Sequence, residues 1–171
     1  MALTLVSIVA LARPAIAQSD TGTPPWISPT AVATGLSDAD WPSLAFTRDG
    51  VEHAVWQTDG QIFYTAQLPG QRWNPPRRIA TGTSPTLVVD DLGQLHALYV
   101  NQFMGNSEIY HIRLATGNWT LPINVSHTSG FSAFPVATAG SGGALYVAWM
   151  DNSPGYWTIS VGQWNGTYWS N

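Results

Sequence analysis

The hydrophobic positions of this chain form short runs that alternate with polar turns. The runs Val51–Trp56 and Leu95–Val100 are rich in the β-branched and aromatic residues that favour strands. Asp49-Gly50 and Asp59-Gly60 supply the positive φ that tight hairpin turns require. No window outside the first residues keeps a helical apolar period. The pattern therefore predicts strands joined by hairpins.

One phrase of the sequence recurs along the chain. The phrase consists of Trp-x-x-Pro, two further residues and a β-branched residue. It begins at Trp26, Trp73 and Trp119, which lie 47 and 46 residues apart. A fixed period in this range is the signature of a repeat architecture. The stretch Asn106–Ser126 contains the phrase together with the strand before it, so we interpret this stretch as scaffold.

Each repeat contains four predicted strands. The predicted units cover residues 41–81, 85–126 and 135–171, and a further strand is expected at 26–34. In the first two units we expect strands at Ser43–Phe46, Val51–Trp56, Gln61–Gln67, Trp73–Thr81, Pro85–Val89, Leu95–Val100, Glu108–Leu114 and Trp119–Ser126, with a longer loop at Asn101–Ser107.

Four short antiparallel strands in each unit of about 46 residues, with no helix between them, are typical of a β-propeller blade. A β-sandwich also has many short strands, but it does not demand similar units at constant spacing. Three blades are fewer than the four to eight that usually close a propeller. The chain is therefore a fragment of a longer protein, or pairs with a second copy to give six blades, or forms an open stack.

The N-terminus has the pattern of a secretory signal peptide. An apolar run at Ala2–Ala12, too short to span a bilayer, precedes the small-x-small motif Ala15-Ile16-Ala17. We expect a signal peptide at 1–17, a polar lead-in at 18–25 and export to the exterior of the cell. Nothing basic precedes the apolar run, and the alternative is a buried first strand.

Charge and cysteine content narrow the classes of partner. Charged residues make up 9% of the chain and the formal net charge is −4, which does not favour a nucleic-acid partner. No membrane span is expected. The chain has no cysteine, so disulfides and thiolate metal sites are excluded.

Three segments resemble the repeats of secreted sialidase-like β-propellers, the BNR or Asp-box group. They are Pro42–Trp56, Gly105–His111 and Trp119–Ser126. The resemblance implies an all-β propeller, with these blades as part of a six-bladed ring. The Asp-box of that group reads Ser-x-Asp-x-Gly-x-x-Trp. The turns before Trp73 and Trp119 keep the glycine and the tryptophan but lack the serine and the aspartate.

The resemblance also implies what a catalytic site would need. Sialidases of this group use three arginines that clamp the substrate carboxylate, a Tyr–Glu nucleophile pair and an aspartate. We expect none of the mature chain's arginines on an innermost strand; these are Arg48, Arg72, Arg77, Arg78 and Arg113. No catalytic residue is therefore predicted. Whether the chain is an enzyme stays open, with non-enzymatic binding favoured.

Residues that recur at equivalent positions are interpreted as structural. His53 and His96 recur on the second strand, and a metal site would need further ligands that the sequence does not supply there. Trp56, Tyr99 and Trp149 recur as expected core between blades. We predict no metal and no cofactor.

Unrepeated polar and aromatic residues lie in the loops between blades and between second and third strands. Aromatic faces beside hydrogen-bonding groups suit a sugar. The predicted ligand-binding residues are Asp38, Asp40, Trp41, Asn101, Asn106, His127, Asp151 and Tyr156. The expected function is recognition of glycans or other cell-surface ligands. The alternatives are an exo-sialidase-type hydrolase whose catalytic residues lie outside this segment, and a structural repeat module.

Overall fold

The computed structural model describes residues 29–32, 35, 38–103 and 105–170. The chain divides into the units Met1–Thr30 and Ala31–Asn171, and the architecture below belongs to the second. The predicted signal peptide, the lead-in and most of the strand predicted at 26–34 lie outside the described residues. The described residues 29–32 form no strand.

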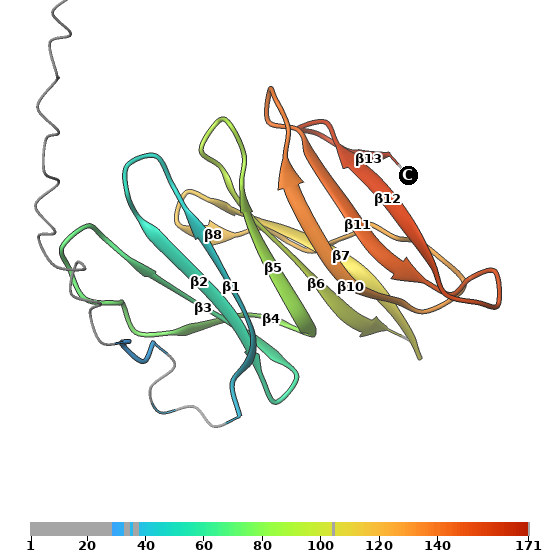
Figure 1. Ribbon diagram of the computed structural model, residues 1–171, viewed down its shortest axis with the longest axis horizontal. Helices are drawn as coiled ribbons and strands as arrows, with labels where there is room; N and C mark the ends of the chain where they lie inside the picture. Colours follow the sequence, from blue (N-terminus) through green and yellow to red (C-terminus); the bar gives the residue numbers. More distant parts are fainter. Residues whose placement is uncertain (1–28, 33–34, 36–37, 104, 171) are drawn as a thin grey trace, which may run out of the picture. The chain divides into compact units, whose positions relative to one another are not determined.

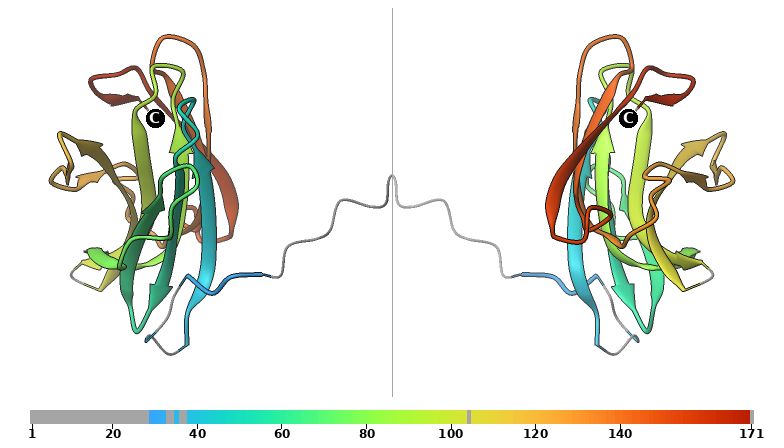
Figure 2. Two further views of the ribbon diagram at one scale, coloured as in Figure 1. Left: turned by 90° about the vertical axis from the view of Figure 1, so that its left-hand side faces the viewer. Right: turned by 90° about the vertical axis from the view of Figure 1, so that its right-hand side faces the viewer.

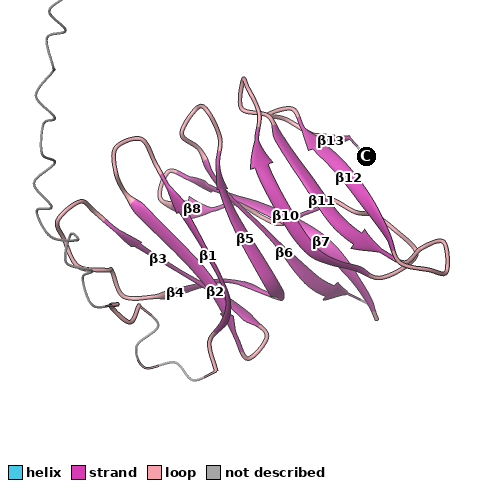
Figure 3. Ribbon diagram, in the orientation of Figure 1, coloured by secondary structure: helices cyan, strands magenta, loops and turns pink. Residues whose placement is uncertain are grey.

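The second unit consists of three antiparallel sheets, which we call blades 1 to 3 (Figure 1). Blade 1 has the strands β1 (Asp40–Phe46), β2 (Glu52–Thr58), β3 (Gln61–Gln67) and β4 (Arg77–Thr81) in that order. Blade 2 has β5 (Thr83–Val89), β6 (Leu95–Phe103) and β7 (Asn106–Ala115), and both β8 (Asn118–Trp119) and β9 (Ile123–Asn124) pair with β7. Blade 3 has β10 (Ser132–Ala139), β11 (Leu145–Asp151), β12 (Thr158–Trp164) and β13 (Trp169–Ser170). The described residues contain no helix (Figure 3), which confirms the predicted all-β architecture.

The turns hold the strands in register through their own side chains. In the β5–β6 turn, Asp90 Oδ1 accepts hydrogen bonds from the backbone N–H groups of Leu92 and Gln94, at 3.0 and 2.7 Å. This is the local bonding that favours aspartate in turns. Gly93 completes the turn with a φ of 84°.

Two strand predictions differ from the structure. The segment predicted as a loop at 101–107 instead extends the β6–β7 hairpin, with Asn101 paired to Glu108 and Gln102 paired to Ser107. The fourth strands are shorter than predicted: β4 covers only Arg77–Thr81, and blade 2 has the short strands β8 and β9 instead. Pro76 and Pro122 have no N–H to donate to a ladder, which accounts for these interruptions.

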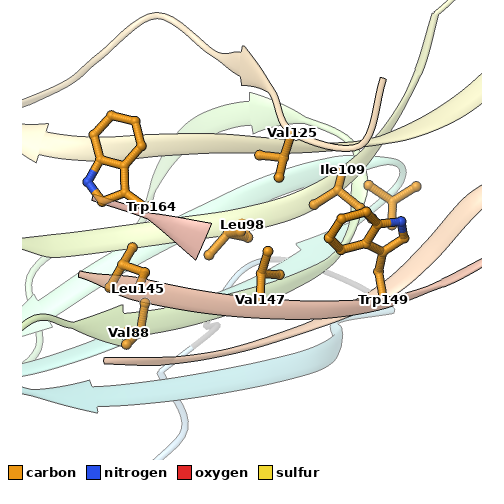
Figure 4. Close-up of a cluster of buried hydrophobic side chains, with 9 residues drawn as sticks. Val88, Leu98, Ile109, Val125, Leu145, Val147, Trp149 and Trp164 are labelled. Carbon is orange, nitrogen blue, oxygen red and sulfur yellow. The ribbon is translucent and has the colours of Figure 1, made fainter. Parts of the chain in front are cut away.

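Hydrophobic cores lie between neighbouring blades. Between blades 1 and 2, the core includes Val55, Ile62, Leu87 and Tyr99. Between blades 2 and 3, it includes the residues labelled in Figure 4, which are Val88, Leu98, Ile109, Val125, Leu145, Val147, Trp149 and Trp164. Blade 2 is thus buried on both faces, and each face packs against one neighbour.

The first strand of each blade carries a bulge near its start. The register shifts between Asp40 and Ser43 in β1, between Thr83 and Thr86 in β5, and between Ala133 and Val136 in β10. The strand β5 contacts both β1 and β10, and Figures 1 and 2 show the three strands beside one another. The bulges therefore lie at the same end of three neighbouring strands.

Candidate functional site

The most distinctive surface feature lies at these bulges. Trp41 of β1 and Phe134 of β10 bring their rings together with centroids 5.4 Å apart and planes inclined by 31°. The two residues come from blades 1 and 3. Trp41 is 49% exposed and Phe134 is 47% exposed, so the pair presents aromatic surface to solvent. We call Trp41 and Phe134 the aromatic pair.

The backbone beneath the aromatic pair is strained in the same way in all three blades. Trp41, Ser84 and Phe134 occupy equivalent bulge positions, and their φ values are 51°, 50° and 54°. Each precedes a proline, Pro42, Pro85 or Pro135, which restricts its backbone further. A non-glycine residue in this region costs about 1 to 3 kcal/mol, and such residues cluster at functional sites. The repeat keeps this conformation while the side chain changes from Trp to Ser to Phe.

Polar groups fix blade 1 to blade 2 beside the aromatic pair. The backbone N–H of Ser84 donates to Gln57 Oε1 at 2.6 Å, and the backbone N–H of Leu87 donates to Ser43 Oγ at 3.0 Å. Asp38, with a φ of 51°, and Asp40 are exposed just before Trp41 in the chain. Exposed aromatic faces and exposed carboxylates thus lie within a few residues of one another in the chain.

A buried polar network lies at the same end of blade 2. Glu108 is buried, and its carboxylate accepts hydrogen bonds from Asn106 Nδ2 at 2.7 Å, from the Thr128 backbone N–H at 3.2 Å and from Ser126 Oγ. Asn106 Nδ2 also donates to the Thr128 carbonyl at 3.0 Å. The network holds the segment that connects blade 2 to blade 3.

Asp151 continues this network in blade 3. It ends β11 and is 2% exposed; its carboxylate accepts bonds from Ser132 Oγ at 3.0 Å and from the Ser153 backbone N–H at 2.8 Å. Burial raises the pKa of the Asp151 carboxyl, but hydrogen bonds from Ser153, Ser132 and Thr128 outweigh it and hold that pKa below its usual value. Asp151 is therefore an ionised group of the scaffold beneath this end of the blades.

The structure separates the predicted site residues into groups. Trp41 joins Phe134, with Asp38 and Asp40 next to it in the chain. Asn106 and Asp151 belong to the buried network, and Asn101 is half-buried in β6, opposite Glu108. His127, with a φ of 45°, and Tyr156 are exposed on separate loops.

Sequence reasoning missed several residues of this region. Phe134 is the partner of Trp41, and Glu108 is the centre of the buried network. One signal was present: a proline opens every repeat, and the residue before that proline is Trp, Ser or Phe. The position before this proline varies between repeats whereas the proline does not, and this position is where the bulge lies. Nothing in the sequence marks the network, because its members lie far apart in the chain.

Three of the described arginines lie away from the aromatic pair. Arg48 is in the β1–β2 turn, at the opposite end of the strand from Trp41, and Arg113 lies on β7, a third strand. Arg77 starts β4; its guanidinium lies 5.4 Å from the Tyr64 ring centroid, and its Nη2 donates to the Gly117 carbonyl.

A second polar cluster lies at the opposite end of blades 2 and 3. Trp169 Nε1 donates to His111 Nδ1 at 3.2 Å, and His111 Nε2 lies 2.9 Å from His96 Nδ1. His96 Nε2 in turn lies 3.3 Å from Asp90 Oδ2. Burial, with the nearby His96 and Arg113, lowers the pKa of His111 to about 3, so this ring is neutral at pH 7.

The tautomers of the two histidines follow from this chain of contacts. His111 Nδ1 accepts from Trp169, so the proton of the neutral ring is on Nε2 and is donated to His96 Nδ1. His96 then donates its Nε2–H to Asp90. Beside this cluster is a cavity of about 310 Å³, whose lining includes Gln94, Arg113 and Trp164. Every polar atom in the chain of bonds has a partner, so we assign the cluster to the packing of blade 2 on blade 3.

Neither a metal-binding cluster nor a membrane-spanning helix is found in the described part of the chain. No group of three or more His, Asp or Glu side chains there could hold a metal ion. No helix in that part is long and apolar enough to cross a membrane.

Comparisons with known proteins support the fold. No protein-family model and no curated protein matches the sequence. Among solved structures, the chain is similar to "Bacteroides ovatus Xyloglucan PUL GH43B" at 16% identity and a TM-score of 0.54, over 77% of this chain and 28% of that one. A Penicillium chrysogenum alpha-L-arabinanase complexed with arabinobiose matches at 14% identity and a TM-score of 0.55, over 78% and 48%.

A third similar structure is a mutant of the alpha-L-arabinofuranosidase arb93a from Fusarium graminearum in complex with an iminosugar inhibitor. It matches at 12% identity and a TM-score of 0.54, over 78% of this chain and 47% of that one. The chain thus spans about half or less of each of these three structures. At these identities the likeness shows the fold alone, and that fold is the β-propeller.

Proposed function

We propose that this chain is a glycan-recognition module and that the aromatic pair is the centre of its binding site. The observation that carries this proposal is the contact of Trp41 with Phe134 on the first strands of blades 1 and 3, with both rings half exposed. Aromatic rings offer flat apolar faces for the C–H side of a sugar, and adjacent carboxylates accept bonds from hydroxyl groups.

The charges around the aromatic pair favour neutral sugars. Asp38 and Asp40 precede Trp41 in the chain and are exposed. A sialic acid carboxylate would be repelled by them, and the arginines described above lie elsewhere. The proposal therefore departs from a sialidase-like ligand, although the repeats resemble that group. The similar structures include one complexed with arabinobiose, a neutral disaccharide, which suggests arabino-oligosaccharides as a first probe.

Export of the protein belongs to the same proposal. The N-terminal apolar run and its small-x-small motif support secretion, where a glycan-binding surface would meet polysaccharides or cell-surface glycans. Detection of the protein in the culture medium, with its N-terminus at Gln18, tests this part separately from binding.

An array of immobilised neutral and sialylated glycans tests the binding proposal. We expect the chain to bind neutral glycans of the array. A sialylated glycan should be bound only where the same glycan without its sialic acid is also bound. Absence of binding to every glycan would contradict a recognition function and leave a structural module as the better account.

A glycoside hydrolase is the second candidate. The named hydrolases above are longer than the part this chain matches, and catalytic residues of such an enzyme would lie in the blades beyond that part. Incubation of the chain with arabino-oligosaccharides and with a fluorogenic sialoside distinguishes the two. We expect binding without release of sugar; release would favour the hydrolase.

A further inference from the structure

A cavity of about 310 Å³ lies between blades 2 and 3, at the end of the blades opposite the aromatic pair. Its size is at the lower end of the ~300 to 1,000 Å³ that small-molecule pockets occupy. Blade 2 lines it with the β5–β6 turn and with His96 and Arg113, and blade 3 lines it with the β10–β11 turn and Trp164. The cavity therefore belongs to the interface of two neighbouring blades.

The largest side chains of this lining are not repeated. Arg113 lies opposite a histidine in the β6–β7 ladder, and its equivalent in blade 1 is Ala66. Trp164, at one end of the core in Figure 4, is the equivalent of Leu114, because each pairs with the tryptophan of a fourth strand. A residue that only packs one blade on the next is expected to recur. The lining of this cavity is instead particular to blades 2 and 3.

The β10–β11 turn keeps the cavity open. Gly142 stands where the β5–β6 turn has Leu92. A Cβ at Gly143 would lie 3.0 Å from the Leu92 side chain and 3.5 Å from Asp90 Oδ2, two residues of the lining. The φ of 77° at Gly143 favours glycine by itself, and the missing side chain also leaves the space beside the Asp90 carboxylate free.

The cavity offers both donors and acceptors of hydrogen bonds. Arg113 is exposed, and its guanidinium has no hydrogen bond or ion pair with any residue that the structure describes. Gln94 donates from Nε2 to a backbone carbonyl, which leaves its Oε1 as an acceptor. Asp90 Oδ2 accepts one bond, from His96, and can accept another.

The hydrogen-bonded cluster behind the cavity fixes the position of this carboxylate. Hydrogen bonds join Trp169 to His111, His111 to His96 and His96 to Asp90. The other oxygen of Asp90 accepts the two backbone bonds of the β5–β6 turn. A group that is already held in place loses little freedom when a ligand binds, which favours binding.

We propose that this cavity is a second ligand site of the chain and that it takes a single neutral sugar unit. The lining carries one guanidinium and one carboxylate, so its charges balance and select neither an acid nor a base. Hydroxyl groups both donate and accept, which suits Arg113, Gln94 and Asp90 together. Leu92 and Trp164 supply apolar surface for the C–H groups of the sugar. The site lies away from the aromatic pair and does not depend on it.

Titration of free monosaccharides into the isotope-labelled full chain, followed by NMR, tests the proposal. The probes are glucose, galactose, mannose and arabinose, with glucuronic acid as the charged counterpart of glucose. We expect saturable shifts of the Gln94 and Gly143 amides with at least one neutral sugar in the millimolar range, and no tighter binding of glucuronic acid. Trp41→Ala should keep these shifts. Binding this weak is not retained on a washed glycan array, so the two sites are tested separately.

Two variants, each with a matched control, locate the sugar. Arg113→Ala should weaken binding at least about tenfold, because the guanidinium donors are lost. Its control is Arg72→Ala, at an exposed arginine of blade 1. Gly143→Ala should also weaken binding at least about tenfold, because the methyl group fills the space beside Asp90. Gly155→Ala places a methyl group at a φ of 88° in open space and should bind as wild type does. Far-UV circular dichroism checks that each variant is folded.

Four results would overturn the proposal. Absence of a saturable shift with every neutral sugar shows that the cavity is not a sugar site. Binding of glucuronic acid alone shows that the site selects an acid. Unchanged binding by both Arg113→Ala and Gly143→Ala shows that the sugar lies elsewhere. Loss of the shifts in Trp41→Ala shows that they report on the aromatic pair.

Discussion

The rings of Trp41 and Phe134 meet at 5.4 Å although one belongs to blade 1 and the other to blade 3. The intervening blade contributes Ser84 at the equivalent position, with the same left-handed backbone. At this repeated position the two outer blades carry large rings and the middle blade carries a small side chain. The substitutions at this repeated position therefore define the site, while the blades around it stay alike.

The strain at the bulge can be measured at Ser84, where no aromatic ring complicates the result. Its φ of 50° suits glycine, so Ser84→Gly should raise the free energy of unfolding by about 1 kcal/mol. The backbone N–H that donates to Gln57 is retained. Urea unfolding measures the change. Ser160→Gly, within β12, is the control and should lower stability by about 0.5 to 1 kcal/mol; a loss at Ser84 as well would contradict the account of strain.

The network around Glu108 should be sensitive to loss of charge. Glu108→Gln keeps the shape but replaces one accepting oxygen with an NH₂ group beside the donors Asn106, Ser126 and Thr128. We expect the free energy of unfolding to fall by about 1 to 3 kcal/mol. The new NH₂ group faces groups that are themselves donors, so buried donors are left without an acceptor. Faster hydrogen exchange at the Thr128 amide should accompany it.

Glu52 is the other glutamate of the chain and provides the matched control. It lies half-buried at the start of β2. Glu52→Gln should change stability by less than about 0.5 kcal/mol. Equal losses for the two variants would show that Glu108 is not the centre of a network.

A close approach of blade 1 to blade 2 depends on Gly82. Its N–H donates to the Gly60 carbonyl at 2.8 Å, its φ is 152°, and a Cβ there would lie 2.3 Å from the Val100 carbonyl oxygen. Gly82→Ala should lower the free energy of unfolding by about 3 kcal/mol. Gly70→Ala also places a side chain at positive φ but in open space, and should cost about 1 kcal/mol. Thermal unfolding compares the two, and similar shifts in Tm would refute the clash.

Stability should fall in acid because of the buried histidines. The pKa of His111 is lowered in the fold from 6.5 to about 3, so the folded state keeps this ring neutral. Its contribution to stability is complete above pH 6.5 and is lost progressively as the pH falls toward 3. Burial also lowers the pKa of His96, although Asp90 opposes this, and His96 therefore contributes in the same direction.

His111→Gln separates this effect from general acid sensitivity. The amide offers a donor toward His96 and an acceptor toward Trp169 but has no proton to gain in this range. The dependence of unfolding free energy on pH should become less steep by up to about 1.4 kcal/mol per pH unit between pH 4 and 6. Denaturant unfolding across that range measures it, and an unchanged slope would contradict the neutral state of His111.

Much of the fold was predictable from the sequence because strands and turns are local. Asp-Gly pairs and the Trp-x-x-Pro phrase placed most strands within a few residues of their observed ends. The hairpin at Asn101–Ser107 was missed because its polar sequence resembles a loop, yet Asn101 and Ser107 lie within its ladder. The segment is a strand because it pairs with β7, and the composition of a segment does not show which strand it pairs with.

The site was predictable only in part, because its contacts join distant segments. Trp41 was identified as an unrepeated aromatic, but its partner Phe134 is in another blade. Asp151 was identified as a loop carboxylate, yet the structure buries it against Ser132 and Ser153. Its role as a direct ligand contact stays a prediction. A repeat shows which positions vary, but only the packing of blades shows which of them meet.

The most direct test of the central claim is binding of the chain and its variants to the glycan array. Trp41→Ala and Phe134→Ala should each weaken binding to the bound glycans by at least about tenfold, or ~1.4 kcal/mol, without loss of folding. Tyr168→Ala removes an exposed aromatic at the opposite end of blade 3 and should bind as wild type does. Unchanged binding by both aromatic-pair variants would contradict the account.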